Sequence, residues 1–287
     1  MPTLKALLSP TPRMCSATDP TVQKDLDDLS QRLEAFYNSP ATRRYFEIAE
    51  TVNDEWTPAL KGNWHLAQSV PKGATVLDLG CGSAPVLRHL AASSPKYTGV
   101  DWSREQMVQN QARFPDAEFL AGSLYDPPLG DRRFDVVMSL FVVEHLVRPQ
   151  LLLDQMLKRA APGGLIALLT PPFRHKEYLK SFPYGFAAIP FADKVKRGKW
   201  IDALVHAYQH RLAYPHWLRT NKPRHSVSGR FLIHLDPVVL NGATFFPDAD
   251  AVYMSDTAEM SAYLAGRGAT EEVHWPEWGY VLMRAPC

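Results

Sequence analysis

The chain of 287 residues has only three cysteines, Cys15, Cys81 and Cys287, spread over its whole length. Three scattered thiols do not make a disulfide framework or a structural zinc site. The apolar runs are strand-sized and far shorter than the ~20 residues that span a bilayer. An excess of one charge is also missing, because 31 Lys and Arg balance 30 Asp and Glu to a net charge of +1. We therefore expect a cytoplasmic, soluble globular protein with no transmembrane segment and no metal site.

The first part of the chain lacks acidic residues before Asp19 and carries Pro2, Pro10 and Pro12. This composition faintly resembles an organelle transit peptide, but the prolines interrupt any amphipathic helix. We expect a mobile tail over residues 1–19. From residue 21 onward, apolar side chains recur every three or four positions, as on one face of a helix. The pattern predicts an N-terminal helical cap over residues 20–66.

Residues 67–170 alternate short apolar runs with helical segments. The runs predict strands over 75–79, 97–101, 117–120, 134–140 and 165–170. Strands that alternate with helices are typical of a mostly parallel sheet with helices on both faces. The pattern resumes over residues 251–287, which predict a helix and two strands joined by a tight turn. The fold class is therefore α/β, a doubly wound Rossmann-like sheet completed by an antiparallel C-terminal hairpin.

Between these parts lies a basic, aromatic insertion over residues 171–250. From Pro171 to Leu235 it holds 12 Lys and Arg against 3 Asp and Glu, a net charge of +9, so the rest of the chain carries −8. Basic and aromatic side chains together favour a mobile lid over an anionic or aromatic acceptor. Binding of a carrier protein, a nucleic acid or a membrane surface remains an alternative for this segment.

A glycine loop, Gly80-Cys81-Gly82, follows the first predicted strand of the sheet. Its glycines let the backbone turn sharply and approach a ligand. A dinucleotide fingerprint needs a third glycine where Pro85 stands, which disfavours a nicotinamide cofactor. Asp78 can face an ammonium group but would repel a pyrophosphate, and Asp101 at the end of the next strand can accept both ribose hydroxyls. The implied ligand is a nucleoside without phosphates and with a cationic amino end, such as S-adenosylmethionine.

Residues 64–170 resemble the class I S-adenosylmethionine-dependent methyltransferases. The motifs that carry the resemblance are Asp78-Leu-Gly-Cys-Gly82, Gly99-Val-Asp101, Gly122-Ser123-Leu124, Phe134–Ser139, Val143-Glu-His145 and Pro162-Gly-Gly-Leu165. Two positions depart from the family pattern. Ala84 stands where a third glycine is common, which is tolerable if its φ stays negative. Ser123 replaces the acid that usually receives the adenine amino group.

The resemblance implies S-adenosylmethionine as cofactor, S-adenosylhomocysteine as product and no metal. The residues expected to bind the cofactor are Asp78, Gly80, Cys81, Gly82, Asp101, Trp102, Ser123, Leu124, Ser139 and Leu140. His145 is expected beside the transferable methyl group, either as a general base or as a residue that positions the acceptor. The residues expected to contact the acceptor are Trp64, Glu144, His175 and Tyr184.

Methyl transfer by in-line displacement to an oxygen, nitrogen or carbon of a small organic acceptor is the leading interpretation. A methyltransferase for RNA, protein or a carrier-bound substrate is the first alternative, which the basic insertion favours. A catalytically inactive partner subunit that binds the cofactor is the second, and Ser123 gives it slight support.

Overall fold

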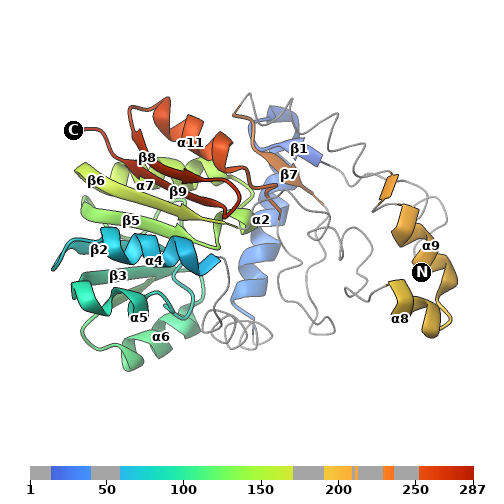
Figure 1. The fold of residues 1–287 in the computed structure, drawn as a ribbon, viewed down its shortest axis with the longest axis horizontal. Helices are drawn as coiled ribbons and strands as arrows, with labels where there is room; N and C mark the ends of the chain where they lie inside the picture. Colours follow the sequence, from blue (N-terminus) through green and yellow to red (C-terminus); the bar gives the residue numbers. More distant parts are fainter. Residues whose placement is uncertain (1–13, 40–58, 171–190, 209–210, 213–228, 236–251) are drawn as a thin grey trace.

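A seven-stranded sheet forms the centre of the protein in the computed structural model, which describes residues 14–39, 59–170, 191–208, 211–212, 229–235 and 252–287 (Figure 1). The strands lie in the order β4-β3-β2-β5-β6-β9-β8. Their bounds are Thr75–Leu79 for β2, Lys96–Asp101 for β3, Glu118–Ala121 for β4, Phe134–Leu140 for β5, Ala160–Leu169 for β6, Thr270–Trp275 for β8 and Tyr280–Arg284 for β9. The five neighbouring strands β4, β3, β2, β5 and β6 are parallel to one another. Strand β9 pairs antiparallel with both β6 and β8. The predicted α/β class and its C-terminal hairpin are confirmed.

Helices cover both faces of this sheet because its strands are apolar on both sides. Val136 and Val137 are consecutive in β5, so their side chains point to opposite faces. Val136 packs in a core with α4 (Ala59–Ser69), α5 (Leu87–Leu90) and α6 (Arg104–Arg113). Val137 packs in the core on the other face with α2 (Gln23–Tyr37), α7 (Pro149–Arg159) and α11 (Thr257–Ala265). The two cores make the sheet a rigid platform for the loops at its edge.

Helix α2 has the apolar stripe that the sequence predicts. A 3-10 turn, η1 (Pro20–Val22), precedes it, and the Asp19 side chain caps this turn by accepting a hydrogen bond from the backbone N–H of Thr21. The buried residues of the helix are Leu26, Leu29, Leu33, Phe36 and Tyr37. Because Tyr37 ends the helix, α2 brings an aromatic side chain to the carboxyl ends of the sheet strands.

A second, two-stranded sheet joins the start of the described chain to its far part. Strand β1 (Met14–Ser16) pairs antiparallel with β7 (Leu232–His234), and Cys15 is buried between them and the core. The mobile tail expected over residues 1–19 is therefore wrong from Met14 onward. The predicted end of the basic insertion, residue 250, also changes. Phe231, Leu232 and Ile233 are buried in the interior of the protein.

Two short helices represent the rest of the basic insertion among the described residues: α8 (Phe191–Lys196) and α9 (Trp200–Tyr208). Residues 171–190, 209–210, 213–228 and 236–251 lie outside the described residues, and so do residues 40–58 of the expected N-terminal helical cap. No helix of the described part of the chain is long and apolar enough to cross a membrane.

Candidate functional site

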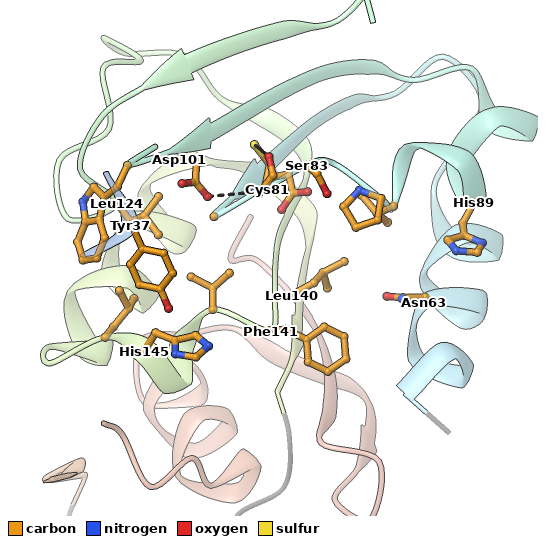
Figure 2. A pocket seen from close by; sticks show the side chains of 18 residues that line it. Tyr37, Asn63, Cys81, Ser83, His89, Asp101, Leu124, Leu140, Phe141 and His145 are labelled. Carbon is orange, nitrogen blue, oxygen red and sulfur yellow. Dashed lines mark hydrogen bonds between the residues drawn. The ribbon is translucent and has the colours of Figure 1, made fainter. Parts of the chain in front are cut away.

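A pocket lies where the carboxyl ends of β2, β3 and β5 meet, the edge at which open α/β sheets bind ligands. Figure 2 shows Asp101, Leu124 and Tyr37 at one end of it, and Asn63 and His89 at the other. The residues that line it are Tyr37, Asn63, Asp78, Gly80, Cys81, Gly82, Ser83, Pro85, Val86, His89, Asp101, Trp102, Leu124, Leu140, Phe141, Val142, His145 and Leu146. Eight of the ten expected cofactor residues are among them.

The glycine loop after β2 forms the floor of the pocket, and Gly80 is required there. Its φ is +87°, a conformation that side chains disfavour. A Cβ atom at this position would lie 2.4 Å from Cγ2 of Val142, which follows β5 across the pocket. The loop is anchored to β3 because the backbone N–H groups of Gly80 and Cys81 both donate to the carbonyl of Val100, at 2.7 and 3.1 Å. The loop thus keeps a fixed shape at the place where a ligand would lie against the backbone.

Ala84 departs from what the sequence predicts. Its φ is +55°, so the condition of a negative φ is not met, and the residue is fully buried. The left-handed conformation costs a residue with a Cβ atom about 1–2 kcal/mol. The loop therefore holds its third left-handed position without the glycine that would relieve it.

Asp101 closes one end of the pocket and is already hydrogen-bonded. One carboxylate oxygen accepts from the backbone N–H of Gly82 at 3.0 Å, and the other accepts from that of Ser103 at 2.9 Å. Burial raises its pKa, and these hydrogen bonds oppose the rise. A carboxylate has about four acceptor positions, so Asp101 keeps acceptor capacity at the pocket that it lines. The predicted ribose contact requires this capacity.

Asp78 and Asn63 present unpaired oxygen atoms elsewhere in the pocket. Asp78 accepts one hydrogen bond through Oδ2, from the Tyr97 hydroxyl at 2.7 Å. Its Oδ1 and the Oδ1 of Asn63 are buried and have no hydrogen-bond partner among the described residues. Burial raises the pKa of Asp78 to about 7; the nearby Asp101 adds to the rise and the Tyr97 hydroxyl opposes it. Two buried acceptors without donors favour a ligand that brings N–H groups.

His145 lies at the pocket wall, but its neighbour Glu144 does not. Both belong to the short 3-10 turn η4 (Val143–His145) after β5, where the His145 ring lies 6.0 Å from that of Tyr37. Glu144 is buried, and its side chain accepts a hydrogen bond from the Thr170 hydroxyl at 3.1 Å. The Glu144 carbonyl also accepts from the backbone N–H groups of Val252 and Tyr253. Glu144 thus helps to hold the turn that carries His145, and the acceptor contact expected of it stays a prediction.

Three further expected residues are absent from the described lining of the pocket. The Ser139 hydroxyl donates to the carbonyl of Leu79 at 2.8 Å, a link between neighbouring strands, and the Ser123 hydroxyl accepts from the N–H of Tyr125. Trp64 is 53% exposed, whereas its neighbour Asn63 lines the pocket. His175 and Tyr184 lie outside the described residues. Tyr37, Asn63, His89 and Phe141 are pocket residues that the sequence motifs did not indicate.

The Cys81 thiol lies in the pocket without the features of a nucleophile. It is buried, and burial raises its pKa well above the ordinary value. Its Sγ atom lies 3.7 Å from the sulfur of Met107 in the core beneath the loop. Among the described residues there is no group of His, Cys, Asp and Glu side chains that could hold a metal ion.

Comparison with known proteins places the pocket in a family. Residues 48–216 match the model of the methyltransferase domain. The chain is 28% identical over 123 residues to the demethylmenaquinone methyltransferase of Paenarthrobacter aurescens, which covers 42% of this chain and 49% of the relative. It is also 28% identical over 139 residues to the malonyl-[acyl-carrier protein] O-methyltransferase of Erwinia billingiae, covering 48% and 54%. A third relative, at 35% identity over 102 residues, is a dTDP-3-amino-3,6-dideoxy-alpha-D-glucopyranose N,N-dimethyltransferase of Streptomyces fradiae, covering 34% and 40%.

The family model matches more than half of the chain, and the chain belongs to the methyltransferase domain family. The chain spans about half the length, or less, of the three relatives named above.

Proposed function

We propose that the protein binds S-adenosylmethionine in this pocket and methylates a small organic acceptor, releasing S-adenosylhomocysteine. The observation that carries the proposal is the distribution of acceptors in one pocket: Asp101 offers acceptor capacity, while Asp78 and Asn63 offer buried oxygens that lack donors among the described residues. A ligand with a ribose and an ammonium group, and without phosphates, satisfies both.

The residues of this pocket fit that cofactor in charge, and the glycine loop lets the ligand lie against the backbone. Gly80 packs directly against Val142, so the loop keeps this close approach only without a Cβ atom. Asp101 would hold the ribose hydroxyls, Asp78 and Asn63 the ammonium group, and Trp102 with Leu124 the adenine ring. Trp102 is already part of an aromatic group, since its ring lies 6.2 Å from that of Tyr37. When bound, the cofactor supplies an activated methyl group on a cationic sulfur.

His145 would act on the acceptor. Its turn is fixed from two sides through Glu144, so the imidazole keeps one position at the pocket wall. From there it can take a proton from an oxygen or nitrogen nucleophile, or align that nucleophile by a hydrogen bond. If it is the base, His145→Ala lowers kcat by about a hundredfold or more and leaves cofactor affinity unchanged. If it only aligns the acceptor, KM rises while kcat largely holds.

The acceptor itself is proposed only by class. The three relatives named above act, by their names, on a quinone, a carrier-bound acid and an amino sugar. These acceptors share a nucleophilic oxygen, nitrogen or carbon on a small organic group, and His145 at the pocket wall would serve any of them. The basic segment supports an anionic acceptor among these.

Isothermal titration calorimetry with S-adenosylmethionine and S-adenosylhomocysteine tests the proposal, with NAD⁺ as the negative ligand. We expect both to bind in the parent and NAD⁺ not to bind. Asp116→Ala, which changes an exposed aspartate outside the pocket, should bind like the parent. Absence of binding at millimolar ligand contradicts the proposal. Binding without formation of S-adenosylhomocysteine from S-adenosylmethionine, across a panel of hydroxyl, amine and carbon acceptors, would instead favour the inactive partner subunit.

A further inference from the structure

The α8–α9 hairpin exposes most of the large apolar side chains that the described surface carries. Nine large hydrophobic residues are exposed among the described residues, and six of them lie within residues 191–212. These six are Phe191, Trp200, Ile201, Leu204, Tyr208 and Leu212. Figure 1 shows the two helices far from the seven-stranded sheet. Such a concentration marks an interaction surface, because single exposed apolar residues are normally scattered.

The exposed side chains of α9 form one continuous stripe. At ~100° per residue, Trp200, Leu204, Tyr208 and Ile201 fall within an arc of about 100°. Ala203, outside this arc, is fully buried. The helix therefore turns its smallest side chain inward and its largest ones to solvent. Trp200 and Tyr208 stand at the two ends of the stripe, and both rings combine an apolar body with a polar tip.

Basic side chains border the stripe at the turn between the helices. Lys196, Arg197 and Lys199 are all exposed. Residues 191–212 hold five Lys and Arg against two Asp. Asp193 forms an ion pair with Lys196 at 3.7 Å. An apolar stripe with aromatic ends and flanking cations is the pattern of helices that lie in the interface of an anionic bilayer.

We propose that the α8–α9 hairpin docks on an anionic lipid surface, with its apolar stripe in the interface and Lys196, Arg197 and Lys199 among the lipid headgroups. A second copy of the chain is a poorer occupant, because a two-fold contact would set one basic hairpin against another. A nucleic acid would use the cations but leave the Ile201 and Leu204 side chains in water. The docking is independent of the proposed methyl transfer, because no described residue of the hairpin lines the pocket.

Co-sedimentation of the full chain with lipid vesicles tests this surface. The vesicles are phosphatidylcholine alone, and phosphatidylcholine in which one lipid in four is phosphatidylglycerol. We expect binding to the anionic vesicles and little to the neutral ones. The double variant Ile201→Ser/Leu204→Ser should lower the partition coefficient by about tenfold or more. Val108→Ser is the matched control, because Val108 on α6 is 67% exposed, as Ile201 is, and should change nothing.

A charge variant separates the electrostatic part of the docking. Lys199→Glu should lower anionic-vesicle binding by about fivefold or more, and Lys72→Glu, an exposed lysine before β2, should have no effect. Circular dichroism and thermal unfolding check that each variant is folded.

Four results would overturn the docking. The first is no co-sedimentation with either vesicle, and the second is binding that the Ile201/Leu204 variant does not weaken. The third is a dimer in sedimentation velocity that this variant dissociates, which assigns the stripe to a second copy. The fourth is a single-stranded RNA gel shift that Lys199→Glu abolishes, together with unchanged vesicle binding, which assigns the cations to nucleic acid.

Discussion

The two carboxylates of the pocket differ in how far the protein satisfies them. Both Asp101 oxygens already accept backbone N–H groups, so this carboxylate is locked in place before any ligand arrives. Asp78 accepts one hydroxyl, and its other oxygen is buried without a donor among the described residues. The cost of burying it is visible in a pKa raised to about 7.

This difference separates a preorganised contact from a conditional one. A contact made by Asp101 requires no rearrangement, because two backbone N–H groups already hold its carboxylate in place. A contact made by Asp78 requires its ionised form, which the empty pocket disfavours and a bound ammonium group favours. We expect the first carboxylate to set how tightly the cofactor binds, and the second to set at which pH.

The largest expected effect comes from Gly80→Ala, which should abolish the cofactor contacts of both Asp101 and Asp78. Gly80→Ala places a Cβ atom 2.4 Å from Val142 and at a φ of +87°. The loop must shift, and we expect no measurable cofactor binding and a loss of stability of about 2–5 kcal/mol. Calorimetry and denaturant unfolding measure the two effects.

Gly73→Ala is the matched control, because Gly73 has a φ of +71° but no atom within 4 Å of the added Cβ. It should lose only the stability cost of the left-handed conformation. Adding Val142→Ala to Gly80→Ala should restore part of the binding, and equal loss in both glycine variants would show that the clash is unimportant.

Asp101→Ala is expected to have the next largest effect. It removes two charge-assisted hydrogen bonds to the ribose, about 1.5–3 kcal/mol each, and also frees the Gly82 and Ser103 backbone. Cofactor affinity should fall by about a hundredfold or more. Asp101→Asn should be milder, because the amide oxygen can still accept one bond. An Ala variant that binds like the parent would place the ribose elsewhere.

Asp78→Asn should change the pH dependence more than the affinity. In the parent, cofactor affinity should fall about tenfold from pH 7.5 to pH 6, because Asp78 becomes protonated through a pKa of about 7. The Asn variant should bind about tenfold more weakly at pH 7.5 and lose this dependence. Tyr97→Phe removes the hydrogen bond that lowers the Asp78 pKa, so the midpoint should move to higher pH. Calorimetry from pH 6 to pH 7.5 measures these affinities. If the cofactor affinity of the parent does not change with pH, Asp78 does not contact the ammonium group.

The same carboxylate should weaken the empty protein. Its folded pKa lies above the unfolded value, so the folded state binds the proton more tightly, and stability is lost as pH rises from about 4 through about 7. At pH 8 the empty Asp78→Asn variant should therefore unfold at a temperature several degrees higher than the parent. A lower unfolding temperature for this variant would mean that ionised Asp78 is well solvated.

The smallest expected effect concerns the glycine loop after β2, which lies between Asp78 and Asp101. Ala84→Gly relieves a φ of +55°, and the flexibility that glycine adds to the unfolded chain offsets part of the gain. We expect a stabilisation of up to about 1 kcal/mol and unchanged cofactor affinity. Ala167→Gly, in the fully buried part of β6, should instead destabilise the protein. Destabilisation by both changes would show that Ala84 is not strained.

The sequence predicted the large sheet well because each of its strands is a local pattern. The segments 75–79 and 134–140 are strands with the predicted bounds, and β8 and β9 are the two strands predicted within residues 251–287. The small sheet was missed because β1 and β7 are only three residues each, too short for a period to show. Their pairing depends on segments that meet only in the folded chain.

In the pocket, motifs predicted positions along the chain but not the direction of side chains. Leu140 lines the pocket, whereas the preceding Ser139 bonds to the neighbouring strand, as the alternation along a strand requires. Neighbouring residues also differ in direction outside the strands. His145 lines the pocket and Glu144 does not; Asn63 lines it and Trp64 does not. Asn63 carries no motif, and only its buried, unpaired oxygen marks it.

The pairing of β1 with β7 also orders the events of folding. The Ser16 hydroxyl donates to the carbonyl of Arg230, which is 214 residues away along the chain. Closing so long a loop costs conformational entropy before any contact repays it, so contacts of this kind form late. During synthesis β1 must wait for its partner strand until the whole seven-stranded sheet except β8 and β9 has left the ribosome. The small sheet is therefore the last part to close among the first 235 residues, and α2 gains its final anchor only then.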